Sequence, residues 1–246
     1  MYLNSIDINA DVGEGINNES ELLPYISSCN IACGGHAGDV NSMIQVVQLA
    51  KKNNVKIGAH PSFPDRKNFG RKPMDISCAA LFSSIKAQIK SLLKVARDAH
   101  YQLHHVKPHG ALYNLAAVDK ATAEVIIEAL KGIQQPLKLY VPYNSIIAEL
   151  AISENIPITY EAFADRNYNN DLTLVSRTHP KALITDRDQL VAHVKQMIWH
   201  NQVKTITGDF RDIEAETYCI HGDNPKANDL VKYLVNALKE AGVKIQ

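Results

Sequence analysis

The segment Asn30-Ile31-Ala32-Cys33-Gly34-Gly35-His36-Ala37-Gly38-Asp39 decides the fold, because its pattern of a short apolar run, small residues and a histidine recurs along the chain. The pattern returns at Ile57-Gly58-Ala59-His60-Pro61, at Val106-Lys107-Pro108-His109-Gly110 and at Cys219-Ile220-His221-Gly222-Asp223. A strand that meets Gly or Pro ends abruptly, so the neighbouring polar residue is presented at the carboxyl end of the strand. Four such endings predict one shared site.

Length and composition limit the classes of protein that the chain can represent. With 246 residues, 46% of them hydrophobic, it can form a substantial core, and a single barrel of alternating strands and helices takes about 250 residues. Lys plus Arg (26) equals Asp plus Glu (26), so no net charge favours nucleic acid or an anionic membrane. No segment reaches the roughly 20 apolar residues of a membrane span. We expect one cytoplasmic domain, residues 1–246.

Strand-like and helix-like segments alternate along the chain. The predicted strands are 5–10, 28–33, 55–59, 102–107, 137–141, 158–163, 203–207 and 216–221. The predicted helices are 41–53 with Asp39 or Asn41 as the cap, 75–101, one capped by Asp119, 144–154, one from Asp186 to about 200, and one from Asn224-Pro225 to 240. The rhythm weakens through residues 167–182, so the seventh unit is irregular.

This alternation predicts the architecture. Strands that alternate with helices of ten or more residues form a parallel sheet with right-handed crossovers. No Gly-x-Gly-x-x-Gly follows the first strand, so a barrel is favoured over a doubly wound sheet. The fold class is therefore α/β, a single-domain distorted (β/α) barrel that can close with seven strands.

A parallel barrel gathers the carboxyl ends of its strands on one face. The residues brought together in this way would be Asp11, Glu14, His36, His60, Lys107, His109, Glu161, Asp165, His221 and Asp223. Two carboxylates about 4 Å apart repel by roughly 4 kcal/mol at an effective dielectric constant near 20, so the cluster needs cations, shared protons or a metal. The available cations are Lys107, Arg66, Arg71 and Arg166.

The chemistry of these side chains leaves two interpretations of the histidines open. Asp11, His36, His60 and His109 have the ligand types of a divalent metal site. Histidine also serves as an acid, a base or a neutral donor near pH 7, and no closely spaced pair of histidines on one helix favours the metal. A metal site is therefore one of two interpretations.

The charged groups near the strand ends also allow two roles each. Lys107 suits a carbonyl oxygen or a phosphate, or a buried ion pair with Glu161. The Asp165-Arg166 pair can place a guanidinium against a substrate carboxylate, or can fix its own loop. The chain contains neither Gly-x-x-x-x-Gly-Lys-Ser/Thr nor Gly-x-Ser-x-Gly, so neither ATP binding by that loop nor covalent serine catalysis has motif support.

Several long motifs together closely resemble the LamB/YcsF family. They are Asn9-Ala10-Asp11-Val12-Gly13-Glu14-Gly15, the segments 30–39, 58–66 and 69–71, Val106-Lys107-Pro108-His109-Gly110-Ala111-Leu112-Tyr113-Asn114, Glu161-Ala162-Phe163-Ala164-Asp165-Arg166 and His221-Gly222-Asp223. The resemblance covers nearly the whole chain. The chain departs from the usual family pattern at Asp171-Leu172, where Gly commonly follows the acid, and at Pro180-Lys181, where Pro-Gly is usual; both lie in the irregular seventh unit.

The resemblance implies a distorted β/α barrel of the glycoside hydrolase and deacetylase type. It also implies the A subunit of an ATP-hydrolysing 5-oxoprolinase, which opens the lactam of 5-oxo-L-proline (5-oxoproline) to L-glutamate with partner subunits B and C, and ATP bound largely through those partners. Two alternatives stay open, a stand-alone metal-dependent deacetylase or amidohydrolase and a non-catalytic ligand-binding subunit.

Lactam hydrolysis needs an activated water, a polarised carbonyl and a proton for the departing nitrogen. As catalytic residues we expect Asp11 or Glu14 to activate water, His36 or His109 to supply the proton, and Lys107 to stabilise the oxyanion or a phosphorylated carbonyl oxygen. Arg166 or Arg66 would hold the substrate carboxylate. The other substrate-binding candidates are His60, Glu161, Asp165, His221 and Asp223.

Overall fold

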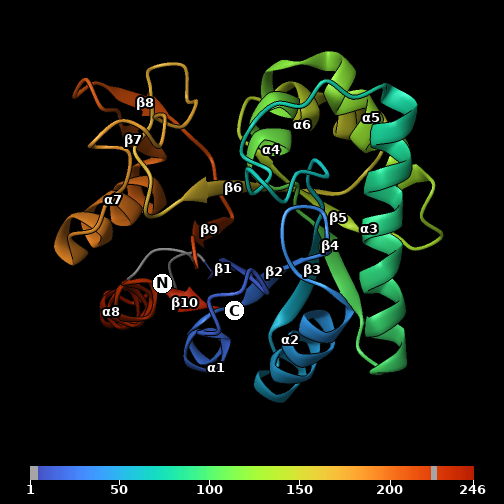
Figure 1. Cartoon of the computed structure of the whole chain (residues 1–246). Coiled ribbons are helices and arrows are strands. Elements are labelled where there is room, and N and C mark those ends of the chain that lie inside the picture. The colour runs from blue at the N-terminus through green and yellow to red at the C-terminus, as the bar shows by residue number, and fades with distance from the viewer. Residues whose placement is uncertain (1–4, 223–225) are drawn as a thin grey trace.

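A computed structural model of the chain describes residues 5–222 and 226–246 (Figure 1). The first half contains β1 Ser5–Val12, α1 Glu19–Leu22, the 3-10 turn Leu23–Tyr25, β2 Ser28–Ala32, α2 Val40–Asn53, β3 Lys56–His60, α3 Cys78–Asp98, β4 Leu103–Val106 and α4 Gly110–Val118. The second half contains α5 Lys120–Lys131, β5 Lys138–Pro142, α6 Ile146–Ser153, β6 Ile158–Phe163, α7 Arg187–His200, β7 Gln202–Lys204, β8 Phe210–Asp212, β9 Thr217–Ile220, α8 Ala227–Glu240 and β10 Lys244–Ile245.

Seven parallel strands close into a barrel. Strands β1 to β6 pair in chain order, β6 pairs with β9, and β9 returns to pair with β1. β10 extends β1 as an additional parallel strand. Helices α2, α3, α5 and α8 lie outside the barrel (Figure 1), so the strand ends remain available for a site. This confirms the predicted distorted α/β barrel and its closure with seven strands.

Two boundary predictions are wrong. The segment 203–207 is not a barrel strand, because β7 forms a two-stranded antiparallel hairpin with β8 within the described part of the chain, and β9 takes the seventh place in the barrel. The long helix begins at Cys78 and not at Asp75, since the Ser77 hydroxyl accepts a hydrogen bond from the Ala80 amide and caps it. The proposed cap Asn224-Pro225 of the last helix lies outside the described residues.

The interior of the barrel is polar where its first strand faces inward. Alternate residues of a strand point to one face, and Asp7, Asn9 and Asp11 are accordingly buried together. The Asn30 amide donates to Asn9 Oδ1 (2.7 Å) and to Asp11 Oδ1 (2.8 Å). The Asn9 amide donates to Glu161 Oε1 at 2.9 Å. These buried groups are bonded to one another, except that Asp7 Oδ2 and Glu161 Oε2 have no hydrogen-bond partner among the described residues. The network fixes the acids at the barrel mouth.

Apolar residues pack between the barrel and the surrounding helices. In α3 they recur at helical spacing and are buried, as predicted from Leu81, Ile85, Ile89, Leu92, Leu93 and Ala96. Removing the side chains of such a face from water stabilises the fold by roughly 1.5–3 kcal/mol for each fully buried Leu or Ile. Within the described parts of the chain, no helix is long and apolar enough to cross a membrane.

The irregular seventh unit forms a loop between β6 and α7. Isolated bridges join Arg166 to Leu183 and Tyr168 to Leu174. Leu172 has a φ of 64°, a backbone conformation in which glycine is unstrained and leucine is not. The loop therefore keeps the turn at the position where the sequence departs from the family pattern, at the expense of local strain.

Candidate functional site

The turn after β2 places His36 over the barrel mouth. Gly38 has a φ of 76°, and a Cβ atom there would lie 2.6 Å from the Ala32 carbonyl oxygen, so the turn requires glycine. Asp39 then caps α2, accepting from the Ser42 amide at 2.8 Å while its own amide donates to the Ser42 hydroxyl at 2.8 Å. This confirms Asp39 as the cap. The tight turn and the capped helix together fix the direction of His36.

Three histidines and one glutamate form a compact cluster at the mouth of the barrel. Glu14 Oε1 lies 2.8 Å from His36 Nε2, 3.5 Å from His109 Nδ1 and 4.0 Å from His60 Nε2. The rings of His36 and His109 stack with centroids 3.6 Å apart. One potential ligand atom from each of the four residues lies within 4.8 Å of the others. The structure thus places Glu14 in this group, whereas the predicted ligand Asp11 lies at its edge, 3.4 Å from His60.

Backbone carbonyls determine which nitrogens of His60 and His109 carry hydrogen. A carbonyl oxygen only accepts, so His60 Nδ1 donates to the Lys107 carbonyl (2.7 Å) and His109 Nε2 donates to the Phe69 carbonyl (2.9 Å). The remaining nitrogens, His60 Nε2 and His109 Nδ1, face each other at 2.9 Å. When both rings are neutral, both of these nitrogens carry lone pairs. A proton or a cation between them would remove this conflict.

Burial favours the neutral form of two of these rings. It lowers the pKa of His36, although the neighbouring Glu14 acts in the opposite direction. Burial, together with the positive forms of His36 and His60, holds the pKa of His109 well below its usual range. Neutral imidazole is the form that binds a metal or accepts a proton. His36 Nδ1 is buried and has no hydrogen-bond partner among the described residues.

Lys107 lies next to this cluster and contacts four groups: it donates to Asp11, to Cys219 and, at 3.5 Å, to Asn9 Oδ1, and it forms an ion pair with Glu161. Its Nζ atom is 2.9 Å from Asp11 Oδ1, 3.1 Å from Glu161 Oε1 and 3.0 Å from Cys219 Sγ. An ammonium has three N–H donors, so the protein itself can engage all of them. The predicted ion pair with Glu161 is therefore present. Binding of an oxyanion by Lys107 would require the exchange of one of these contacts.

The charges of Asp11 and Lys107 stabilise each other. Burial opposes ionisation of Asp11, but His60 and Lys107 outweigh it and hold the pKa of its carboxyl well below the usual range. Burial likewise opposes the charge of Lys107, and Asp11, Cys219 and Glu161 outweigh it, so the pKa of the amine lies well above its usual range. Both groups are ionised at neutral pH. A carboxylate of such low basicity is a poor general base.

The loop that follows β3 covers the cluster. The ring of Phe69 packs edge-on against His36 and His109, with centroids 5.1 and 5.4 Å away. The guanidinium of Arg71 lies over the Phe69 ring, 4.7 Å from its centroid. The Gly70 carbonyl accepts from the Ala111 amide at 2.9 Å, which ties the loop to α4. The cover thus belongs to the site.

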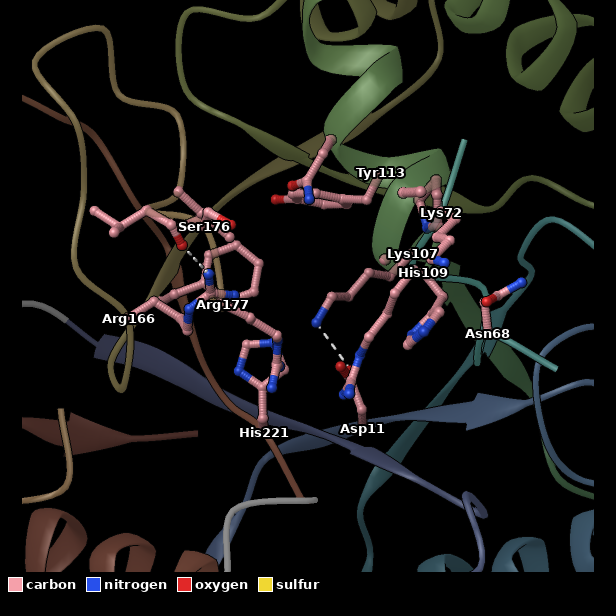
Figure 2. Close-up of a pocket in the computed structure, with 18 of the residues that line it drawn as sticks. Asp11, Asn68, Lys72, Lys107, His109, Tyr113, Arg166, Ser176, Arg177 and His221 are labelled. Carbon is pink, nitrogen blue, oxygen red and sulfur yellow. Dashed lines mark hydrogen bonds and ion pairs between the residues drawn. The ribbon is translucent and has the colours of Figure 1, made fainter. Parts of the chain in front are cut away.

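A cavity of about 410 Å³ opens beside the cluster, within the size range of small-ligand sites. Figure 2 shows Asp11, Lys107 and His109 on one side of this cavity and Arg166 and Arg177 on the other. The lining also includes Asn68, Arg71, Lys72, Tyr113, Ser176, Thr178 and His221. One wall therefore offers acids and imidazoles, and the opposite wall offers guanidinium groups to an anion.

The other predicted residues take different places. Asp165 is fully buried and holds His221, with Oδ1 2.9 Å from Nδ1 and Oδ2 accepting from the His221 amide at 3.2 Å. Arg166 lines the cavity and also binds the carbonyls of Val175 and Ala182, so it fixes its own loop as well. Burial and the nearby Arg177 lower its pKa to about 10, and it stays charged.

Six predicted residues do not line the cavity or cannot be placed there. Glu14, His36, Glu161 and Asp165 lie among the side chains around the barrel mouth without lining the cavity. Arg66 is exposed, donates to the Gly38 carbonyl and does not appear in the lining of the large cavity. Asp223 lies outside the described residues. The sequence argument brought Glu14, His36, His60, Lys107, His109 and His221 to one face, and the structure brings these side chains to the same barrel mouth.

Sequence reasoning missed several residues of the site. Asn9 and Asn30 lie in predicted strands but are not among the predicted site residues, although the alternation Asp7-x-Asn9-x-Asp11 signals a polar inward face. Arg177 and Ser176 lie in the irregular loop, where no periodicity indicates which side chain faces the barrel. Their place in the cavity lining follows only from the tertiary fold.

Comparisons with known proteins agree with this architecture. A crystal structure of the lactam utilization protein from Thermus thermophilus superposes with a TM-score of 0.92 at 34% identity and covers 98% of this chain and 99% of that chain. A structure of T48 deacetylase with substrate shares the fold, with a TM-score of 0.52 at 12% identity, and covers 99% of this chain and 88% of that chain.

Relatives in sequence match almost end to end. A protein of Pyrococcus horikoshii, named as the A subunit of 5-oxoprolinase, is 39% identical over 245 residues, 98% of this chain and 96% of that protein. One of Bacillus cereus with the same name is 40% identical over 249 residues, 99% of this chain and 98% of that protein. The family model described as the LamB/YcsF family matches residues 6–246. The motifs, the barrel and these matches agree, and the chain belongs to the LamB/YcsF family.

Proposed function

We propose that this chain is the A subunit of an ATP-dependent 5-oxoprolinase and opens the lactam ring of 5-oxo-L-proline to give L-glutamate. The observation that carries the proposal is the cluster of Glu14 and three histidines beside the Asp11–Lys107 pair at the barrel mouth. From this group Asp11, His60, Lys107 and His109 line the cavity. Full-length relatives of about 40% identity bear the name of that subunit. The proposal treats residues 1–246 as one domain.

The two walls of the cavity suit the two polar ends of the substrate. The carboxylate of 5-oxoproline would face the guanidinium groups of Arg166 and Arg177, since Arg binds carboxylates with paired N–H donors. The lactam carbonyl would then point toward the imidazole cluster and Lys107. This orientation places the bond to be broken beside groups that can accept a proton and bind a developing negative charge.

The acid–base properties divide the roles of the two carboxylates. Asp11 is engaged by Lys107 and Asn30, and its lowered pKa makes it a weak base. It acts as a positioning residue for Lys107. Glu14, surrounded by imidazole nitrogens, is the better acceptor for the proton of the attacking water. The lowered pKa of His36 and His109 leaves both rings neutral at neutral pH. Either ring must therefore take up the proton from Glu14 before it can donate to the departing nitrogen.

A divalent metal fits the cluster of Glu14, His36, His60 and His109. The imidazole lone pairs of His60 and His109 face each other beside a carboxylate oxygen, and each of these two rings donates its other N–H to a backbone carbonyl, as metal-binding histidines usually do. When bound, the ion would polarise a carbonyl and lower the pKa of a bound water. The residues themselves hold the ring orientations whether or not the ion is present.

ATP and the partner subunits B and C complete the proposal. The sequence contains no phosphate-binding loop of the Gly-x-x-x-x-Gly-Lys type, so we assign ATP use to the partners. The guanidinium groups of the cavity could bind a substrate that is phosphorylated on its carbonyl oxygen. Phosphorylation would activate the lactam carbon for attack by water.

Reconstitution with omission of one component at a time tests the proposal. The chain with subunits B, C and ATP should form glutamate and ADP from 5-oxoproline, and leaving out this chain should abolish glutamate. Glutamate formation by B and C alone would refute the proposal. Hydrolysis of an amide by this chain without ATP or partners, lost on chelation, would instead support a metal-dependent amidohydrolase. Ligand binding without any effect on turnover would support a non-catalytic role.

A further inference from the structure

Glu161 has one oxygen bonded and one oxygen free. Its Oε1 atom accepts from the Asn9 amide at 2.9 Å and lies 3.1 Å from Lys107 Nζ. Its Oε2 atom is buried and has no hydrogen-bond partner in the described part of the chain. A buried carboxylate oxygen without a donor is costly, by about 1–3 kcal/mol or more for a charged group. The open oxygen therefore indicates a missing donor.

The hydroxyl of Tyr113 is in the same situation. It is buried and unpartnered among the residues described, and it belongs to α4 at the edge of the large cavity, where Figure 2 shows the ring above Lys107. Burial, the negative charge of Glu161 and weak donation toward that carboxylate hold the pKa of this hydroxyl well above its usual range. The two side chains thus face each other without forming a full hydrogen bond. Tyr113 therefore keeps its proton at neutral pH and can both donate and accept a hydrogen bond.

Glu161 and Tyr113 both line a second cavity, of about 190 Å³, next to the large one. Tyr113, Asn114, Phe163 and Leu174 form walls of both cavities. Tyr143, Tyr168 and Asp171 also face the second cavity. It contains two carboxylates and aromatic rings, and its lining includes neither Lys nor Arg. An acidic, aromatic pocket binds N–H donors and ammonium groups and repels carboxylates.

We propose that Glu161 Oε2 and the Tyr113 hydroxyl form the subsite for the nitrogen of the substrate. This inference rests on the proposed function, which gives binding partners to the carboxylate and the carbonyl of 5-oxoproline but none to its nitrogen. The lactam N–H donates to Glu161 Oε2. When water adds to the carbonyl carbon and the C–N bond breaks, both protons of that water end on the nitrogen and its oxygen stays in the new carboxylate. The nitrogen is then an ammonium, which donates to Glu161 and to Tyr113.

The subsite distinguishes substrate from product by charge. A neutral lactam offers one N–H, whereas the opened amino acid offers three and a positive charge, so the carboxylate of Glu161 binds the nitrogen more strongly as the ring opens. Interactions that strengthen along the reaction raise its rate. In a five-membered lactam the carbonyl carbon is bonded to the nitrogen, so a ring held at Glu161 has its carbonyl beside Lys107, which contacts the same carboxylate at 3.1 Å.

A lactone that carries a ring oxygen in place of the N–H tests the subsite. The probes are 5-oxo-L-proline and 5-oxotetrahydrofuran-2-carboxylate, and binding to the chain assembled with B and C is measured by calorimetry without ATP. Wild type should bind the lactam roughly tenfold to a hundredfold more tightly than the lactone, because the lactone presents an acceptor to a carboxylate. Equal binding of the two probes by wild type would overturn the subsite.

The variant Glu161→Gln gives the sharpest comparison. Its amide oxygen can keep the contacts with Asn9 and Lys107, which turns the amide NH₂ toward the cavity. The amide NH₂ of the variant would then face the lactam N–H, which is also a donor, or the ring oxygen of the lactone, which is an acceptor. The variant should therefore bind the lactone more tightly than the lactam. If Glu161 had only a structural role, the variant would bind both probes more weakly by the same factor. An unchanged preference for the lactam would therefore refute the proposal.

Tyr113→Phe removes the hydroxyl and keeps the ring, so it tests the subsite even where Glu161→Gln fails to fold. It should weaken lactam binding several-fold and lactone binding less. Tyr160→Phe is the matched control, because Tyr160 packs against Tyr143 and neighbours Glu161 on β6, where alternate residues face opposite sides. It should change neither affinity. If Tyr113→Phe weakens both probes equally, its hydroxyl serves only the structure.

The two proposals fail separately. Glutamate formation by wild type with the partners tests the function, and the lactam-to-lactone ratio tests the subsite. An active enzyme whose Glu161→Gln variant keeps its preference for the lactam would retain the function and lose the subsite.

Discussion

Lys107 Nζ lies 2.9 Å from Asp11 Oδ1, and both side chains are buried at the mouth of the barrel. This pair connects the Glu161 side of the site with the imidazole side, because Asp11 Oδ2 is 3.4 Å from His60 Nε2 and Lys107 also contacts Glu161. The pair thus holds together residues from several strands. The contribution of this pair to the stability of the fold can be measured separately from catalysis.

Replacing Lys107 should destabilise the fold. Lys107→Met leaves Asp11 and Glu161 as buried charges without their cation, and loss of one partner of a buried pair costs about 3–5 kcal/mol. Chemical denaturation should show this loss in the free energy of unfolding. The control is Lys94→Met, since Lys94 forms an exposed pair with Asp98 at 2.6 Å and such pairs contribute about 1 kcal/mol or less. Equal losses in both variants would contradict the structural role of the buried pair.

Stability should fall as the pH drops below about 6.5. Burial lowers the pKa of His193 to about 4, and that of His104, with help from Lys56 and Lys138, also to about 4. Below the ordinary histidine pKa of about 6.5 the unfolded chain binds protons that the folded chain does not. His193 therefore destabilises the fold by up to about 1.4 kcal/mol per pH unit until its folded pKa is reached, and partly exposed His104 contributes less because solvent screens it. Above about pH 6.5 this contribution to stability is fully present.

The variant His193→Gln should make this pH dependence shallower by one proton. Its unfolding free energy, measured by denaturant titration between about pH 6.5 and 4.5, should fall about 1.4 kcal/mol per pH unit less steeply than that of wild type. An unchanged slope would show that His193 titrates alike in the folded and unfolded chains.

The imidazole cluster should bind one divalent ion. Protein loaded with Zn²⁺ and then desalted should retain it, and its Tm should rise over that of the chelated protein, because a ligand that binds only the folded state stabilises it. His60→Asn should lose both effects, while His200→Asn, at the exposed end of α7, should keep them. Equal zinc content in the two variants would exclude the cluster as the binding site. A shared proton would then account for the close approach of His60 Nε2 and His109 Nδ1.

Gly58 is expected to tolerate no side chain. A Cβ atom there would lie 2.1 Å from Nε2 of His105, whose ring stacks on Tyr140 with centroids 3.9 Å apart. Gly58→Ala should therefore destabilise the fold by about 1–3 kcal/mol through overpacking. Gly132→Ala is the control, since its Cβ would meet mainly the flexible end of Lys86. Thermal unfolding compares them, and a Gly58→Ala variant as stable as Gly132→Ala would contradict the packing described.

The sequence predicted the barrel and most of its site because the relevant signals are local. Gly and Pro after apolar runs mark the strand ends, and parallel strands bring those ends together, so His36, His60, Lys107 and His109 lie at one barrel mouth. The same argument could not choose between Asp11 and Glu14 as the neighbour of the histidines, because that depends on which way two carboxylates close together in one segment point.

Other features depend on tertiary contacts that no local pattern reports. The segment 203–207 has the composition of a strand, but its partner β8 follows after a short turn and forms a hairpin away from the barrel. Arg177 enters the cavity from a loop without periodicity. The open oxygen of Glu161 and the unpartnered hydroxyl of Tyr113 become visible only when every buried polar atom in the described residues is matched with a donor or acceptor.

Glutamate formation by the reconstituted three-subunit enzyme, compared between wild type and Glu14→Gln, tests the central claim most directly. Glu14→Gln keeps the shape of the side chain and removes its basicity, so glutamate formation should fall by about 10²- to 10⁴-fold while unfolding stability and assembly with B and C are retained. Exposed Glu154→Gln should remain as active as wild type. A Glu14→Gln enzyme that forms glutamate at the wild-type rate would show that the lactam is not opened at this cluster.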